Sequence, residues 1–289
     1  MTTVTTPSAR PLLDLDPDRP AARPTDAATL VLIRDTAAGL EVFCVQRNAK
    51  SGFMGGAIVF PGGRVEEGDH GHEWDGLVLP ADARVDALAD GALSRALAIA
   101  ACRECLEEAA ILPVDGPLSQ ADVLALREVL QSDPAALRRA LSTRGLRLNL
   151  PAMVPFARWI TPVAERRRFD ARFFMLRAPA GQTGVHDAHE TTQSFWATPD
   201  DVIARWQRSE IQLAPPTHHT LWTLSRAESV DAALAGASVR PLKAIEPHLI
   251  QYDGTRALTL PGDAEHPQSE RLTDGATRYV LRQDHWRPE

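Results

Sequence analysis

The amino-acid sequence predicts a mixed α/β fold, and three observations support this prediction. Short apolar or alternating runs at residues 28–34, 40–47 and 57–60 are typical of strands, and a turn-like segment between the first two indicates a hairpin. Residues 96–112 are rich in Ala, Leu and Ile and contain no Pro or Gly, which favours a helix. Further strand-like runs lie at residues 156–161, 171–176 and 192–196.

The remaining segments divide into a tail, several helices and a C-terminal extension. Residues 1–25 are rich in Thr, Pro, Ala and Asp and have no periodic apolar face, so we expect a disordered tail. Ser94 is the expected N-cap of the helix at 96–112. Two amphipathic helices with caps at Ser119 and Asp133 are expected at 119–131 and 133–143, and helix-start signals recur at 198–201 and 215–216.

Composition indicates a soluble globular protein and narrows the classes of partner. The 289-residue chain is 44% hydrophobic and 24% charged, with a net charge of −7. This charge argues against broad binding to nucleic acid or to anionic membranes, while a bound cation would still permit a small anionic substrate. Three cysteines give no even disulfide framework, and no secretory signal pattern is present, so we expect a cytoplasmic protein.

An acidic face on the expected helix is the first functional signal. Glu104, Glu107 and Glu108 lie at positions i, i+3 and i+4, so their carboxylates project from one side of the helix and repel one another. A salt-bridged surface face, with Arg95 and Arg103 as partners, is one explanation. A divalent cation such as Mg²⁺ is the other, because hard cations prefer carboxylate oxygens.

Two separate segments together resemble the box motif of the Nudix hydrolase family. They are residues 62–69, GGRVEEGD, and residues 103–111, RECLEEAAI. Three departures from the family pattern stand out. Asp69 occupies a position where Glu is usual. Ala110 replaces a Gly, so we expect the helix to end without the left-handed residue that Gly favours. Residues 70–102 separate the two halves, where the simple box has seven residues.

This long separation is similar to that in a split-box subgroup of the family, which includes a peroxisomal coenzyme A diphosphatase. The subgroup's other motifs are matched by WITP at 159–162, by FDARFF at 169–174, and by Glu190 ahead of WATP at 196–199. The resemblance implies an α/β/α sandwich around a mixed sheet, formed by one domain over residues 26–289. Its insertions would lie at about 70–95 and 117–150, followed by a C-terminal extension.

The resemblance also implies a metal-dependent hydrolase of diphosphate bonds that uses Mg²⁺ or Mn²⁺. Glu104, Glu107, Glu108 and the Gly62 carbonyl would bind the metal. Gly63, Asp69 and Arg103 would have structural or orienting roles. Either Glu104 or Glu190 would accept a proton from the attacking water, and Glu190 is alternatively a metal ligand or a surface acid.

The substrate is less sharply defined than the reaction. Arg47, with VFPGG at 59–63, partly reproduces a pattern of coenzyme A diphosphatases, and Arg166, Arg167 and Arg168 could bind a 3′-phosphate or form a solvated turn. We therefore predict a small nucleoside diphosphate derivative, coenzyme A or acyl-coenzyme A. ADP-ribose, an NDP-sugar or a dinucleotide is the alternative, and a non-catalytic ligand-sensing module is an alternative of another class. We expect no nucleic acid or membrane partner, and a homodimer is left open.

Overall fold

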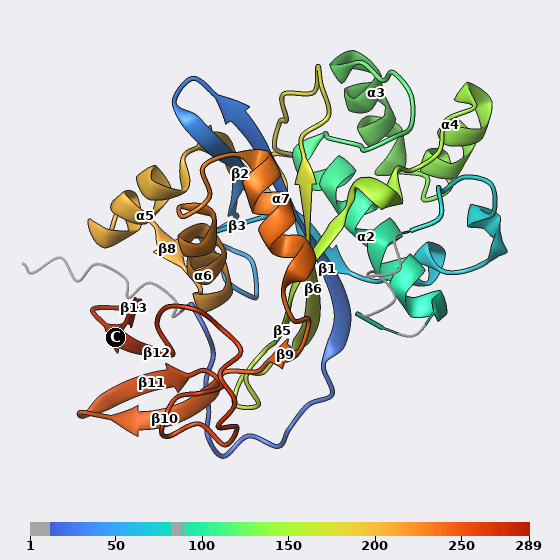
Figure 1. Ribbon diagram of the computed structural model, residues 1–289. Helices are drawn as coiled ribbons and strands as arrows, with labels where there is room; N and C mark the ends of the chain where they lie inside the picture. Colours follow the sequence, from blue (N-terminus) through green and yellow to red (C-terminus); the bar gives the residue numbers. More distant parts are fainter. Residues whose placement is uncertain (1–11, 82–87, 90) are drawn as a thin grey trace, which may run out of the picture.

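The computed structural model describes residues 12–81, 88–89 and 91–289, and a mixed sheet lies at its centre (Figure 1). The strand order is β8-β3-β2-β1-β6-β5-β9, with β4 paired to β1 and β7 paired to β2. The pairs β1–β6, β3–β8 and β5–β9 are parallel, and the others are antiparallel. The strands are β1 (Thr25–Thr36), β2 (Gly39–Arg47), β3 (Ala57–Val59), β4 (Gly62–Arg64), β5 (Val154–Ile160), β6 (Phe169–Arg177), β7 (Thr191–Ala197), β8 (Gln212–Leu213) and β9 (Ala244–Ile245).

Helices cover both faces of this sheet, so the predicted α/β/α sandwich is confirmed. In β1, Leu30 and Leu32 join the hydrophobic core on one face, while Val31 and Ile33 join the core on the other face. A strand that is buried on both faces reads as a continuous apolar run, as the sequence does here. The first face carries α2 (Gly91–Ala109), α3 (Gln120–Leu130) and α4 (Ala136–Arg144), and the second carries α5 (Pro199–Gln207), α6 (Pro215–Leu224) and α7 (Val230–Val239).

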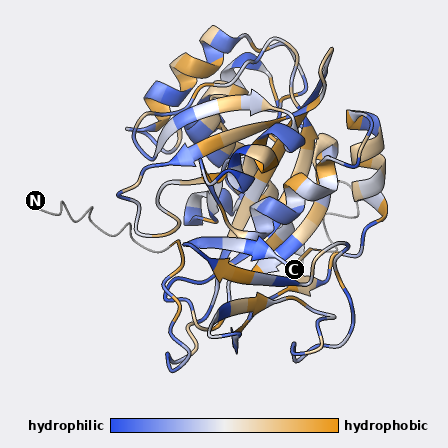
Figure 2. Cartoon of the chain, turned by 90° about the vertical axis from the view of Figure 1, so that its left-hand side faces the viewer, coloured by the Kyte–Doolittle hydropathy of each residue, from blue (hydrophilic) through white to orange (hydrophobic). Residues whose placement is uncertain are grey.

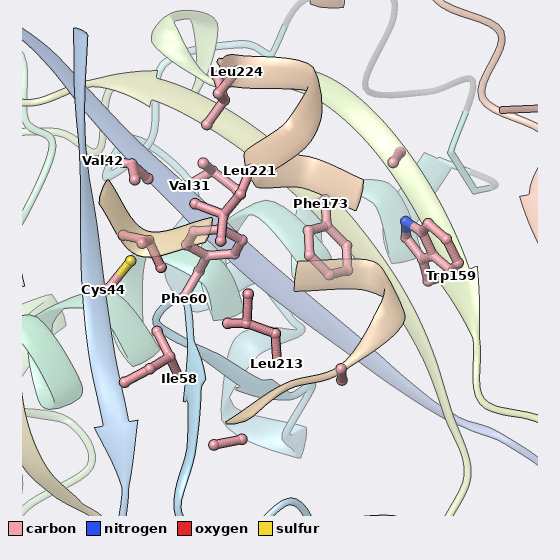
Figure 3. Close-up of a cluster of buried hydrophobic side chains, with 14 of the residues drawn as sticks. Val31, Val42, Cys44, Ile58, Phe60, Trp159, Phe173, Leu213, Leu221 and Leu224 are labelled. Atoms are coloured by element: carbon pink, nitrogen blue, oxygen red, sulfur yellow. The ribbon is translucent and has the colours of Figure 1, made fainter. Parts of the chain in front are cut away.

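The C-terminal extension forms a second antiparallel sheet that shares the core on the α6 face. It contains β10 (His248–Tyr252), β11 (Thr255–Thr259), β12 (Arg278–Arg282) and β13 (His285–Pro288). Apolar stretches alternate with polar ones along its strands (Figure 2). Tyr279 is buried and its hydroxyl lies 3.1 Å from Nδ1 of His218 in α6. Figure 3 shows the same core nearer the main sheet, where Leu221 and Leu224 of α6 pack with Val31 and Phe60.

The N-terminal segment corrects one expectation. Leu12, Leu13 and Leu15 are buried, and Leu15 forms a β-bridge with Glu165. The buried Glu165 carboxylate accepts hydrogen bonds from the backbone N–H groups of Asp14 at 2.7 Å and Arg166 at 2.8 Å. The expected disordered tail is therefore wrong for residues 12–24, and β1 starts directly after them. The rest of that tail, residues 1–11, lies outside the described residues.

The two ends of α2 also differ from expectation. The helix already includes Gly91, and the Ser94 hydroxyl donates to the Gly91 carbonyl within the first turn, so Ser94 is not the N-cap. At the other end Ala110 adopts a left-handed conformation with φ of 49°, and its N–H bonds to the Leu106 carbonyl at 3.0 Å. The helix thus ends as a Gly would end it, at a backbone cost of about 1 kcal/mol. Cys102 and Cys105 of this helix are buried.

The other expected elements lie close to their predicted positions. Each predicted strand is present, and the hairpin of β1 and β2 is confirmed. Ser119 caps α3 by accepting a hydrogen bond from the Asp122 N–H. The following helix, α4, begins at Ala136, later than its predicted start at Asp133. Among the described residues, no helix combines the length and the apolar character that a bilayer crossing requires.

We predict that Glu165→Ala releases the N-terminal segment. The substitution leaves several backbone N–H groups without their buried acceptor, at a cost of about 1–3 kcal/mol for each group that stays unsatisfied. The melting temperature should fall, and limited proteolysis should cleave within residues 12–24 before the rest of the chain. Glu128→Ala, at an exposed position of α3, is the control. Equal proteolysis patterns for the two variants would contradict the prediction.

Candidate active site

The two halves of the motif meet where β4 lies against α2. The Gly62 N–H donates to Glu108 Oε2 at 3.0 Å. A Cβ on Gly63 would overlap the Glu104 carboxylate, and a Cβ on Gly62 would overlap the Ala28 carbonyl. Only glycine permits so close an approach between strand, helix and neighbouring strand. The two glycines therefore allow β4, α2 and β1 to approach one another closely.

Arg103 joins the two halves by a second route. Its guanidinium contacts both carboxylate oxygens of Asp69 at 2.9 Å and donates to the Arg64 carbonyl at 3.0 Å. Its Nη1 donates to Glu104 Oε1 at 2.8 Å and lies 3.5 Å from Glu107 Oε1. Asp69 is 2% exposed and also accepts from the Glu66 N–H. Asp69 therefore supplies the anchoring contact although it is shorter than the usual Glu, and Arg103 orients two of the glutamates.

The glutamates are buried more than carboxylates usually are, and this raises their pKa values. Burial, followed by the nearby Glu104 charge, raises the pKa of Glu108 to about 8, although Arg47 Nη1 lies 3.9 Å from Glu108 Oε1. Burial raises the pKa of Glu104 to about 7 against the opposing charge of Arg103. Burial also raises the pKa of Glu107. Each ionised carboxylate thus lacks enough compensating positive charge.

This shortage of positive charge is what a divalent cation would supply. Carboxylate and carbonyl oxygens are ligands that Mg²⁺ and Mn²⁺ accept, and Glu104, Glu107, Glu108 and the Gly62 carbonyl provide them. Within the described ranges, no three Asp, Glu, His or Cys side chains converge on one point. The donor chemistry fits a hard divalent cation, while the carboxylates stay apart, two of them bound to Arg103.

A cavity of about 710 Å³ opens beside these carboxylates. Glu104, Glu107 and the β4 glycines line one part of it, and the loop after β2 lines another. Residues of the WITP and FDARFF motifs line a third part. The polar and charged residues that line the cavity as a whole include Arg47, Asn48, Lys50, Arg64, Glu66, Arg103, Arg167, His189 and Glu190.

The arginines predicted to bind substrate differ in their position relative to the cavity. Arg47 and Arg167 line the cavity, and Arg167 lies against Gly52. Arg166 is exposed and does not line the cavity. Arg168 is 8% exposed and bonds the Thr161 carbonyl at 3.0 Å, the Ala22 carbonyl at 2.6 Å and the Glu246 carboxylate at 2.5 Å. The expectation that Arg168 binds substrate is wrong, because its guanidinium is occupied in holding chain segments together.

Glu190 lines the cavity from an exposed loop, and α3 holds that loop in place. Arg127 Nη1 donates to the Val185 carbonyl at 2.6 Å, and Gln120 Oε1 accepts from the Thr183 N–H at 2.7 Å. These contacts join residues about 60 positions apart that share no motif, so the sequence alone does not predict them. The nearby charge of Glu190 also raises the pKa values of Glu104 and Glu108.

Comparison with known proteins agrees with this geometry. The family model for the NUDT19 Nudix domain matches residues 89–224. Acyl-coenzyme A diphosphatase NUDT19 from Gallus gallus is 30% identical over 287 residues, covering 81% of this chain and 74% of that protein. The Homo sapiens protein of the same name is 26% identical over 272 residues, covering 78% of this chain and 72% of that protein.

One solved structure supports the same assignment at the level of the fold. The crystal structure of a Nudix hydrolase from Alicyclobacillus acidocaldarius superimposes with a TM-score of 0.63 and 29% sequence identity. The match covers 76% of this chain and 99% of that chain. It therefore includes the whole of a smaller relative and leaves about a quarter of the present chain as additional structure.

We predict that the metal-free protein loses stability as the pH rises from 6.5 to 8.5. The pKa values of Glu104 and Glu108 rise from the usual 4.5 to about 7 and about 8, so the folded state binds more protons than the unfolded state. The stability that this protonation provides is complete below about 4.5 and is lost as the pH passes the folded values. His218 and His219, whose pKa values burial lowers to about 4, stay neutral in this window.

Urea unfolding in EDTA measures this slope. Glu108→Gln, which carries no titrating proton at this position, should flatten it, whereas Glu67→Gln at an exposed position should leave it unchanged. Mg²⁺ or Mn²⁺ should raise the urea midpoint more at pH 8.5 than at pH 6.5, because the cation takes the place of the protons. Equal slopes for wild type and Glu108→Gln would contradict the prediction.

Proposed function

Because the chain belongs to the Nudix hydrolase family, we propose that it is a metal-dependent diphosphatase acting on coenzyme A or acyl-coenzyme A. The observation that carries the reaction is the acidic face of α2, held against the β4 glycines at the side of a large cavity. The proposed substrate is supported by the vertebrate relatives, which are named acyl-coenzyme A diphosphatases. Arg47 and Arg167 in the cavity lining provide positive charge for an anionic substrate.

The residues of this chain have distinct tasks in the proposed reaction. Glu104, Glu107, Glu108 and the Gly62 carbonyl would hold Mg²⁺ or Mn²⁺, which reduces the negative charge that repels a nucleophile from a diphosphate. Arg103 keeps Glu104 and Glu107 oriented. Water attacks one phosphorus and the bridging P–O bond breaks, which gives 3′-phosphoadenosine 5′-phosphate and 4′-phosphopantetheine or its acyl thioester. A carboxylate accepts the proton that the water loses.

Glu104 is the stronger candidate for that carboxylate. Glu104 lines the cavity beside the β4 glycines, and a general base must lie close to the proton that it accepts. Its contact with Arg103 Nη1 at 2.8 Å fixes the position of the side chain. Glu190 lies on an exposed loop at the cavity wall, where it would have a supporting role such as binding a second cation or ordering water.

Alternative substrates, a non-catalytic role and the cellular location can be distinguished by experiment. ADP-ribose, NDP-sugars and dinucleotides contain the same type of bond, and a ligand-sensing module would bind one of these without hydrolysis. All three motif glutamates are present, which favours an enzyme. A cytoplasmic location stays a proposal, supported by three free, buried cysteines.

The test of the proposed function is a substrate screen with purified protein and either Mg²⁺ or Mn²⁺. Coenzyme A, several acyl-coenzymes A, ADP-ribose, an NDP-sugar and a dinucleotide are incubated, and the products are identified by mass spectrometry. The proposal expects 3′-phosphoadenosine 5′-phosphate from coenzyme A or its thioesters. Turnover of ADP-ribose without turnover of any coenzyme A species would reject the substrate, and no turnover at all would reject the enzyme.

We predict that Glu107→Gln lowers kcat by about 10²-fold or more while the fold is retained, because the variant loses one of the carboxylates that would hold the cation. Glu107 is partly exposed, so its substitution disturbs little packing. The measurement is steady-state hydrolysis together with a melting curve. Glu67→Gln, also in the acidic part of the motif but exposed, should keep wild-type kcat. Near-normal activity of Glu107→Gln would remove this residue from the site.

We predict that Glu104→Gln and Glu190→Gln separate the two candidate bases. Loss of a general base typically costs about 10²–10⁴-fold in rate. Glu104→Gln should therefore fall into this range and lose the acid limb of the pH–rate profile, while Glu190→Gln should stay within about tenfold of wild type with its acid limb unchanged. A profile that loses its acid limb only in Glu190→Gln would reverse the assignment.

A further inference from the structure

We propose that the aromatic end of the cavity binds the pantetheine arm and acyl chain of an acyl-coenzyme A, and that the N- and C-terminal additions to the fold close this end. The proposal rests on the function proposed above. It goes further by assigning a tail-binding subsite to Trp159, Phe169, Phe173, Pro247 and Leu258, all of which line the cavity.

The side chains on the floor of the cavity change from small to aromatic across the strands of the main sheet. Strand pairing places Arg64 of β4 opposite Ala27 of β1, Ala27 opposite Ala171 of β6, and Ala171 opposite Trp159 of β5. Directly paired residues point to the same face of a sheet. Small side chains therefore occupy this face on β1 and β6, between Arg64 on β4 and the aromatic Trp159 on β5.

A second row of paired residues also runs from small side chains to an aromatic one. Gly62 is opposite Thr29, and Thr29 is opposite Phe173. Figure 3 shows Phe173 and Trp159 on neighbouring strands beneath α6. Because neighbouring strands are about 4.8 Å apart, Trp159 lies about 14 Å across the sheet from β4. A diphosphate at the glutamates thus needs a long extended substituent to reach the aromatic end, as a pantetheine arm is and a single ribose is not.

The walls of this end are apolar and come from both termini of the chain. Pro215 and Pro216 at the start of α6, Pro247 before β10 and Leu258 of β11 line it, and Leu13 of the N-terminal segment joins them. Pro247 and Leu258 follow α7 and Leu13 precedes β1, so all three lie outside the strands β1–β9 and the helices α2–α7 of the sandwich. The additions to the fold therefore shape the cavity at the end remote from the carboxylates.

Most charged side chains line the rest of the cavity, although Arg167 lies close to the aromatic end, since Gly52 adjoins Phe53, whose ring packs edge-on against Phe169. Glu104 and Glu107 lie at the β4 end, Arg47 and Lys50 lie on the loop after β2, and Arg167 lies against that loop at Gly52. A ligand that fits this distribution is anionic at one end and apolar at the other. An acyl-coenzyme A has this chemistry, whereas a dinucleotide or an NDP-sugar is polar along its whole length.

Binding in EDTA tests the subsite without turnover. Calorimetry compares dodecanoyl-coenzyme A, coenzyme A and 3′-phosphoadenosine 5′-phosphate, which lacks the arm. The wild type should bind dodecanoyl-coenzyme A at least about tenfold more tightly than coenzyme A, because burying a few methylene groups provides that difference. Ala171→Leu fills the floor between the two ends and should remove most of this preference while leaving the binding of 3′-phosphoadenosine 5′-phosphate unchanged.

Two further variants keep the outcome clear. Ala171→Val makes a smaller change in the same place and should reduce the preference partly, which covers the case in which Ala171→Leu does not fold. Ala235→Leu, on an exposed position of α7, should behave as wild type. Equal wild-type affinity for coenzyme A and its dodecanoyl thioester, or an equal loss for all three ligands in Ala171→Val, would overturn the subsite. Failure of the proposed function is a separate result, since it appears as tight binding without hydrolysis when Mg²⁺ or Mn²⁺ is added.

Discussion

The close approach of β4 to α2 is the constraint on which the site depends. Three carboxylates on one helical face repel one another, and burial makes each charge more costly. The Gly62 N–H compensates part of the Glu108 charge at 3.0 Å, and this contact requires that neither Gly62 nor Gly63 carries a Cβ. The remaining shortage of positive charge stays at Glu104 and Glu108, whose pKa values are raised to about 7 and about 8. The fold thus keeps a region that favours cations at the side of the cavity.

The same constraint explains how the motif tolerates the long segment between its halves. Asp69 and Arg103 form a two-point ion pair, so the end of the first half is fixed directly to the start of the second. Trp74 Nε1 donates to the Gly68 carbonyl at 2.8 Å, and Arg95 donates to the Gly71 carbonyl at 2.7 Å. The intervening chain is therefore attached at both of its ends, and its length does not alter the relative position of glycines and glutamates.

The sequence predicted those parts of the fold that depend on local pattern. Strands and helices follow from periodicity, and the acidic face of α2 follows from spacing within one helix. Leu12 and Leu13 escaped prediction because their burial depends on Glu165 and on strands distant in sequence. Arg168 was misassigned for a similar reason, since three adjacent arginines look alike in sequence and only the packing distinguishes one with a Glu246 partner from one at the cavity.

The proposed roles divide the residues that would perform the reaction from those that would select the substrate. The residues that would face the diphosphate lie on β4 and α2, and α3 holds the loop that carries Glu190 through Arg127 and Gln120. The far end of the cavity is instead closed by chain segments before β1 and after α7, which share a core with α6. Changes in those segments would alter the length and polarity of the cavity while leaving the glutamates in place. A fold arranged in this way can change the group attached to the diphosphate without changing the bond that is broken.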